Sequence, residues 1–242
     1  MSGAILIMAR APRAGACKTR LEPLLGADGC AALQTELIRH TAAWACASGR
    51  RVWMAFDPSD AEAELAPLLP GAVHLFPQLG PSLGERLTNA VDQVGRRHRG
   101  PISVFGTDSP TVGGRDVDAL ELAVAGGWDA CLLGAHDGGY AAITLAPPLP
   151  DAFALPPELW GGPDVLVHTL DLLRRQGRSA AVLDVVHDLD TPEDAARILR
   201  SGSCPHSVRL LLSRAVRASA GGMPAAGRFD PQAQRRLYVG SA

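Results

Sequence analysis

The sequence predicts an α/β fold with a mostly parallel central sheet that helices cover on both faces. Short apolar runs alternate along the chain with stretches of helical periodicity, which indicates strands joined by helical crossovers. Several of these runs end in polar loops that contain Gly, Pro or Asp. In a parallel sheet such loops gather at one edge, where ligands bind.

The first predicted strand is residues 4–9, a short apolar run that ends at Arg10. A helix should follow and end near Gly49, because apolar or small side chains recur there every three to four residues. These are Leu33, Leu37, Thr41 and Trp44. Further strands are predicted at residues 52–56, 73–76 and 102–105, with a helix at 83–94.

The second half of the chain continues the alternation. A helix near residues 117–124 precedes a strand in "WDACLLG", and residues 141–145 are again extended. The next helix begins at Pro163 and stops at Gly177. Residues 182–186 form the last predicted strand, and Thr191-Pro192-Glu193-Asp194 has the pattern of a capped helix start.

Composition favours an ordinary globular protein, with 47% hydrophobic and 20% charged residues. The net charge of −2 argues against nucleic-acid binding, which requires a basic surface. Five scattered cysteines without a C-x-x-C pair indicate neither a disulfide framework nor a zinc site. We expect a cytoplasmic protein, because no signal peptide and no apolar run of about 20 residues is visible.

Residues 10–21, "RAPRAGACKTRL", resemble a phosphate-binding P-loop only at first sight. Pro12 and Cys17 stand where that motif requires glycines, so a P-loop cradle is not expected. Four cations surround Gly15 in this stretch with no acid among them, namely Arg10, Arg13, Lys18 and Arg20. The loop is either an anion-binding site or a solvated basic turn.

Carboxylates follow three of the predicted strands. Asp108 in "GTDSP" is a candidate ligand for a divalent cation, or a cap of the next turn. Asp188 and Asp190 in "HDLDTP" are a second carboxylate source, although one of them need only cap the helix after Thr191. "HDGGY" has the pattern of a hairpin turn, or its glycines let a sugar or phosphate approach while Asp137 accepts hydroxyl hydrogen bonds.

Six stretches in this order resemble the bacterial DUF2064 family of GT-A-like glycosyltransferases, which includes proteins assigned to arsenosugar biosynthesis. They span about residues 4–200: "ILIMARAPRAGACKTRL", "QLGPSLGERL", "VFGTDSPTV", "LGAHDGGYAAITL", "LWGGPDVLVHTL" and "HDLDTPEDAARIL". The resemblance implies a Rossmann-like GT-A fold, a three-layer αβα sandwich, over residues 1–204. Residues 205–242 would be a basic extension, with a short helix at 208–216 and a poorly ordered or loosely packed remainder.

The resemblance also implies an activity, that of a metal-dependent glycosyltransferase. It would move a sugar from a nucleotide-diphosphate donor to a small acceptor and use Mg²⁺ or Mn²⁺. Asp108 and Asp137 are then the catalytic residues, and Asp108 and Asp190 the metal ligands. The residues assigned to donor binding are Arg10, Gly15, Lys18, Arg20, Gly84, Arg86, Gly138 and Gly139.

Two positions depart from the family pattern. Pro81-Ser82 stand where relatives often have Gly-Asp, and Ala141-Ala142 follow Tyr140 where larger residues are usual. The alternative functions are a nucleotidyltransferase, which takes an NTP and releases pyrophosphate, and a non-catalytic nucleotide-sugar binding protein. We expect small-molecule partners, no nucleic acid and no membrane span. Neither the identity of the sugar and acceptor nor the oligomeric state follows from the sequence.

Overall fold

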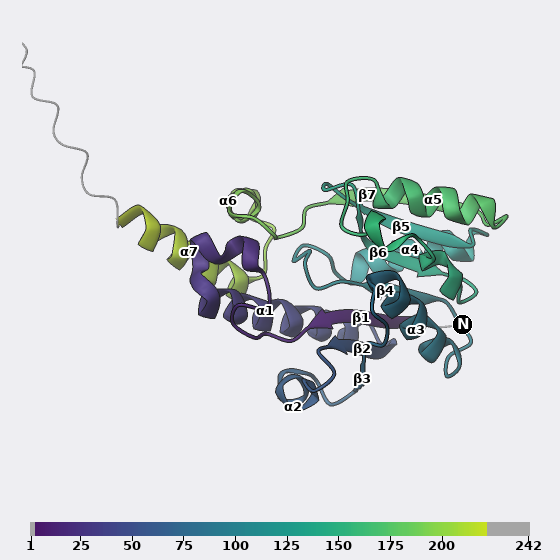
Figure 1. The fold of residues 1–242 in the computed structure, drawn as a ribbon, viewed down its shortest axis with the longest axis horizontal. Helices are drawn as coiled ribbons and strands as arrows, with labels where there is room; N and C mark the ends of the chain where they lie inside the picture. The colour runs from purple at the N-terminus through teal and green to yellow at the C-terminus, as the bar shows by residue number, and fades with distance from the viewer. Residues whose placement is uncertain (1–2, 222–242) are drawn as a thin grey trace, which may run out of the picture.

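A seven-stranded sheet forms the centre of the computed structural model, which describes residues 3–221 (Figure 1). The strand order is β3-β2-β1-β4-β6-β5-β7; β6 is antiparallel to both of its neighbours, and all other neighbouring strands are parallel. The strands are β1 (Ala4–Arg10), β2 (Arg51–Asp57), β3 (Val73–Pro77), β4 (Ile102–Phe105), β5 (Ala130–Ala135), β6 (Tyr140–Leu145) and β7 (Ala180–Val186). The predicted α/β class with a mostly parallel sheet is therefore confirmed.

Helices cover both faces of the sheet, which gives three layers. The α-helices are α1 (Glu22–Ala47), α2 (Glu62–Leu65), α3 (Leu83–Gly95), α4 (Gly114–Ala125), α5 (Val165–Arg175), α6 (Pro192–Ser201) and α7 (His206–Gly221). The short helix α2 and the 3₁₀ turns were not predicted from the sequence. Helix α1 begins earlier than its apolar stripe because it continues across a kink at Gly26, where φ is 66°.

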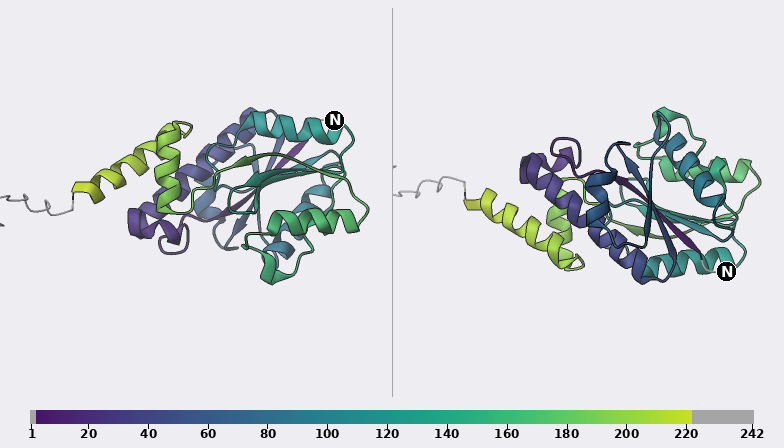
Figure 2. Two further views of the ribbon diagram at one scale, coloured as in Figure 1. Left: turned by 90° about the horizontal axis from the view of Figure 1, so that it is seen from above. Right: turned by 90° about the horizontal axis from the view of Figure 1, so that it is seen from below.

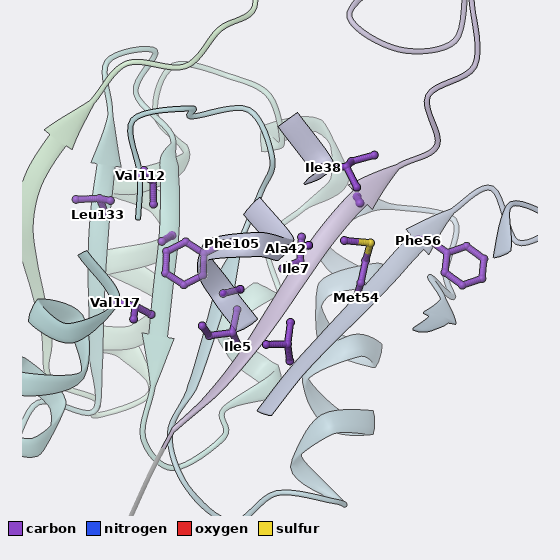
Figure 3. Packing of buried hydrophobic residues seen from close by; sticks show 14 of the residues in the cluster. Ile5, Ile7, Ile38, Ala42, Met54, Phe56, Phe105, Val112, Val117 and Leu133 are labelled. Atoms are coloured by element: carbon purple, nitrogen blue, oxygen red, sulfur yellow. The ribbon is translucent and has the colours of Figure 1, made fainter. Parts of the chain in front are cut away.

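Two apolar layers hold the helices on the sheet. On one face, Ile7, Met54 and Phe105 from three neighbouring strands pack with Ile38 and Ala42 of α1 (Figure 3). Helices α2 and α4 complete this layer, whereas α3 and α5 pack on the opposite face. Alternate residues of β1 point to the two layers, as the period of a buried strand requires.

Strand β6 lies antiparallel between β4 and β5, and its sequence did not reveal the pairing with β4. It returns from β5 through the "HDGGY" turn, in which the Ala135 amide donates to the Gly139 carbonyl and the Gly138 amide to the Ala135 carbonyl. The hairpin interpretation of this motif is therefore confirmed. It brings Asp137 to the same edge of the sheet as the parallel strand ends.

Helix caps fix two starts beside that edge. The Ser82 hydroxyl accepts a hydrogen bond from the Glu85 amide at the start of α3. At α6 the Thr191 hydroxyl accepts from the Asp194 amide, while the Asp194 carboxylate accepts from the Thr191 amide. This reciprocal cap confirms the predicted helix start.

Helices α6 and α7 form a separate apolar cluster with the first part of α1. Figure 2 shows α7 (yellow) beside α1 (purple) and directed away from the sheet. Val208 and Leu212 are buried there against Leu33 and Leu37. The start of the predicted basic extension is thus a helix attached to the body, and it is longer than expected; residues 222–242 lie outside the described part of the chain. Within the described residues, no helix has the length and hydropathy needed to cross a bilayer.

If α7 belongs to the folded body, Leu212→Ala should lower the free energy of unfolding by about 2–5 kcal/mol, because it opens a cavity in a packed cluster. The matched control is Leu210→Ala on the same helix, where the side chain is 44% exposed and the expected change is below about 0.5 kcal/mol. Urea denaturation compares the two. Equal effects would show that α7 does not contribute to the core.

Candidate active site

The polar loops predicted to converge meet in one cleft of about 870 Å³ at the carboxyl ends of the strands. The cleft is walled by the loop after β1, the loop after β4, the hairpin after β5 and the segment after β7. The predicted site residues that line it are Arg10, Gly15, Lys18, Arg20, Arg86, Asp108, Asp137, Gly139 and Asp190. The topology therefore brings together residues that are far apart in the sequence.

Lys18 is at the centre of these contacts. Its ammonium Nζ lies 2.5 Å from Asp108 Oδ1 and 2.8 Å from Asp190 Oδ1, and it donates to the Leu189 carbonyl at 2.9 Å. The backbone of Lys18 is left-handed, with φ 51°, and its side chain is 5% exposed. Since an ammonium has three N–H donors, three protein oxygens use them all.

The charge of Lys18 is compensated within the protein. Burial disfavours its charged form, but the nearby Asp108 and Asp190 carboxylates outweigh burial and raise the pKa of Lys18 above its usual range. Lys18 therefore stays protonated and holds the two carboxylates together. Its direct contact with a diphosphate stays a prediction. Arg10 and Arg20 are exposed cations that line the same cleft.

Asp188 is the most perturbed carboxylate of the site. Burial, together with the neighbouring Asp137, Asp108 and Asp190, raises its pKa to about 6, although the Ser109 hydroxyl donates a hydrogen bond to it. Four carboxylates thus gather at one end of the cleft. Concentrated negative charge of this kind favours binding of a cation.

Arg10 and Arg86 meet on the other side of the cleft. Both guanidinium groups pair with Asp57 Oδ2, at 3.5 Å for Arg10 and 3.2 Å for Arg86, and the Arg86 Nε also donates to the Gly80 carbonyl at 3.0 Å. Asp57 therefore fixes two of the predicted donor-binding side chains. Asp57 is the last residue of β2. Like Asp108, it therefore lies at the carboxyl end of a parallel strand, where ligands bind in such sheets.

Asp137 lies at the tip of the hairpin with its side chain exposed. Its Oδ1 accepts a hydrogen bond from the Gly139 amide at 2.9 Å, which orients the carboxylate. Gly138 next to it has φ +91°, and a Cβ there would overlap the Pro163 carbonyl. This turn therefore requires glycine for packing.

Gly84 also has a packing role, because a Cβ would lie 2.7 Å from both the Phe153 carbonyl and Trp160 Nε1. Neither Gly84 nor Gly138 is among the residues that line the cleft. Their assignment to donor binding stays a prediction. Trp160 itself packs against the buried layer next to α3 and α5, in addition to lining the cleft.

The cleft residues that sequence reasoning missed include Gln34, Asp57 and Gln78. Asp57 and Gln78 stand directly at the ends of β2 and β3, so the rule that selected Asp108 would have found them. Gln34 comes from the buried stripe of α1 and gave no such signal. Asp188 was considered, but only Asp190 was selected.

The donor set suits a hard cation. Mg²⁺ is commonly held by one or two carboxylates together with substrate phosphates, and Asp108 and Asp190 are carboxylates with 52% and 37% of their side chains exposed. Within residues 3–221, no group of three or more His, Cys, Asp or Glu side chains is placed to hold a metal ion by itself. The residues fit a metal that nucleotide and protein bind jointly.

Comparison with known proteins agrees with this geometry. A family model described as an uncharacterized protein conserved in bacteria, DUF2064, matches residues 30–157, just over half of the chain. The chain belongs to the DUF2064 family. It is also 31% identical over 196 residues to the phosphoenolpyruvate guanylyltransferase of Rubrobacter xylanophilus, covering 79% of this chain and 92% of the relative.

Solved structures of other proteins have a similar fold. A protein of Desulfovibrio desulfuricans G20, provisionally assigned as a nucleotide-diphospho-sugar transferase, is 26% identical with a TM-score of 0.80, covering 90% of this chain and 98% of its own. A 4-diphosphocytidyl-2C-methyl-D-erythritol synthase, 14% identical with a TM-score of 0.54, covers 87% of this chain and 98% of its own. This DUF2064 chain thus has the fold of transferases that act on nucleotides or nucleotide sugars.

The raised pKa of Asp188 predicts a stability cost at neutral pH. Between about pH 4 and pH 6 the unfolded chain loses this proton first, so stability should fall as pH rises, by up to about 3 kcal/mol for a shift of about two units. Asp188→Asn should therefore be more stable than wild type at pH 7 and similar at pH 4. Urea denaturation at both values tests this, and a variant less stable at pH 7 would contradict it.

Proposed function

We propose that this protein is a metal-dependent transferase. It would move a sugar from a nucleoside-diphosphate sugar, its donor, to a small acceptor. The observation that carries the proposal is the meeting of cationic side chains and carboxylates in one cleft, with Lys18 Nζ 2.5 Å from Asp108. The high structural similarity to the Desulfovibrio protein supports the sugar-donor assignment.

The cationic side chains and the carboxylates of the cleft have different proposed roles. Arg10 and Arg20 would neutralise the donor diphosphate, because both are exposed in the cleft. Asp108 and Asp190 would hold Mg²⁺ or Mn²⁺, which, when bound, offsets charge on the departing diphosphate. Lys18 would position both carboxylates, since all of its donors are directed at protein oxygens.

Asp137 would contact the acceptor. Its Oδ1 is held by the Gly139 amide, which leaves the exposed carboxylate directed by the hairpin at the edge of the cleft. A carboxylate in this position would accept a hydrogen bond from an acceptor hydroxyl and take up its proton as the new bond forms.

Nucleotidyl transfer is the second candidate, and the guanylyltransferase relative favours it. It would use the same cations and metal but an NTP in place of a sugar nucleotide. The products separate the two reactions, because a sugar donor yields a nucleoside diphosphate and an NTP yields pyrophosphate. Ser82, which prompted the idea of a non-catalytic binding protein, has a structural role here as the cap of α3.

A thermal-shift panel distinguishes the two reactions. We expect nucleotide sugars with Mn²⁺ or Mg²⁺ to raise the melting temperature, because a ligand that binds only the folded protein stabilises the folded state. A chelator should abolish the rise. Stabilisation by NTPs alone would instead favour nucleotidyl transfer, and pyrophosphate release measured with the same NTP would establish it.

Asp108→Asn should lower kcat by about 100-fold or more, because the metal would lose a charged ligand while the side chain keeps its shape. The matched control is Asp118→Asn, a change of the same kind at an exposed side chain of α4, where Asp118 pairs with Arg50. The control should keep full activity. The measurement is steady-state kcat of both variants relative to wild type. An Asp108→Asn variant with wild-type kcat would exclude the proposed metal role of Asp108.

A further inference from the structure

Helix α1 carries one amide, Gln34, in a buried stripe whose other side chains are apolar, thiol or hydroxyl groups. Gln34 is 3% exposed. It lies where α1 passes from the cluster with α6 and α7, which includes Leu33, to the layer on the sheet, which includes Ile38. A buried amide is costly unless it is hydrogen-bonded, so its partners decide whether this position is tolerated.

The side chain of Gln34 joins two loops of the cleft. Its Nε2 donates to the Arg10 carbonyl at 3.1 Å, where the basic loop begins, and to the Thr107 hydroxyl at 3.2 Å, next to Asp108. Thr107 is 4% exposed, so the bond between the two side chains is shielded from water. The Arg10 carbonyl can only accept, which fixes the orientation of the amide. One amide group thus spans the ends of β1 and β4.

Cys30, one turn before Gln34 on the same buried face of α1, holds the other end of the basic loop. Its thiol donates to the Lys18 carbonyl at 3.2 Å. Burial raises the pKa of Cys30, so the thiol keeps the proton that it donates. Helix α1 therefore fixes the backbone of the basic loop at Arg10 and at Lys18. Of these two side chains of α1, only Gln34 also reaches the loop after β4.

The contacts of Gln34 differ in kind from the ion pairs of Lys18. Lys18 joins the basic loop to Asp108 and Asp190, whose carboxylates are the proposed metal ligands. A cation would compete with the ammonium for these oxygens. The partners of Gln34 are a backbone carbonyl and a hydroxyl with no proposed ligand role, so a bound cation does not compete for this bridge.

We infer that Gln34 is a positioning residue that fixes the basic loop relative to Asp108 and thereby couples binding of the donor diphosphate to binding of the metal ion. The inference rests on the proposed function, in which Arg10 neutralises the diphosphate and Asp108 holds the cation. A cation shared by phosphate and carboxylate needs both at a fixed separation. Without the amide, each loop relaxes around its own ligand, and the two ligands no longer strengthen each other.

The experiment measures this coupling by calorimetry on the full chain. The ligand is whichever of ADP, GDP, CDP and UDP binds the wild type most tightly, and its dissociation constant is determined with a chelator and with saturating Mn²⁺. In the wild type we expect Mn²⁺ to strengthen binding about tenfold or more. Gln34→Met, which keeps the length of the side chain, should reduce this ratio to about threefold or less. The dissociation constant with chelator should change by less than about twofold, because the exposed Arg10 and Arg20 remain.

A second variant identifies the hydrogen bond that carries the coupling. Thr107→Val removes the acceptor on the β4 side and keeps the shape of the side chain, so it should also lower the ratio. The double variant should lower it no further than Gln34→Met alone, because both changes break the same bridge. Thr107→Val also serves as the test if Gln34→Met does not fold.

Gln78→Met is the matched control. Its Nε2 also donates to two oxygens at the cleft, the Ala9 and Ala55 carbonyls, but these lie on β1 and β2 and not on the loop after β4. This variant loses a comparable structural amide without separating the basic loop from Asp108. It should therefore keep the wild-type ratio.

The outcomes separate this inference from the proposed function. An unchanged ratio in Gln34→Met, or an equal loss in Gln78→Met, would overturn the inference and leave nucleotide binding in place. Additive losses in the double variant would show that Gln34 and Thr107 act separately, which would also overturn it. A wild type that binds none of the four nucleotides, or binds them equally with and without Mn²⁺, would refute the proposed metal-dependent use of a nucleotide and the inference with it.

Discussion

The site depends on one buried cation between two carboxylates. Lys18, Asp108 and Asp190 come from three loops that are distant in the sequence, and the ammonium joins all three. A buried ammonium without such partners would be strongly destabilising, and so would two carboxylates held together without it. The three loops are therefore interdependent. Any change in one of them alters the charge balance of the others, which makes the cleft a single electrostatic unit.

An apolar contact holds that unit in place. Leu189, between Asp188 and Asp190, is fully buried in the cluster that α6 and α7 form with α1, and its amide donates to the Asp108 carbonyl at 2.8 Å. Burial of Leu189 fixes the positions of Asp188 and Asp190 on either side of it. Both of these carboxylates are only partly exposed. The helices furthest from the sheet thus contribute to the geometry of the charged centre.

Most of the fold could be predicted from local patterns, and the site only in part. Apolar runs and caps located the strands and most helices because burial and capping leave a mark on neighbouring residues. The hairpin motif indicated that β6 is antiparallel to β5, but its pairing with β4 could not be predicted, since pairing between distant strands leaves no local pattern. Asp108 and Lys18 were selected from their loops, but their direct contact depends on a left-handed backbone at Lys18 and on three donors being shared among distant oxygens. Gln78 was passed over because a single glutamine after a strand has no distinctive pattern.

The two sides of the cleft differ in the kind of constraint they impose. On the β4 side, Asp188 keeps a charge that burial and three neighbouring carboxylates oppose, so the fold retains an arrangement that is unfavourable for stability. On the β3 side, every donor of Gln78 is satisfied and only an acceptor remains. Concentrated negative charge is useful where a cation must be bound, because the cation relieves the repulsion among the carboxylates. The unfavourable charge of the cleft is therefore concentrated at the β4 side, whereas the β3 side is held by hydrogen bonds to the backbone.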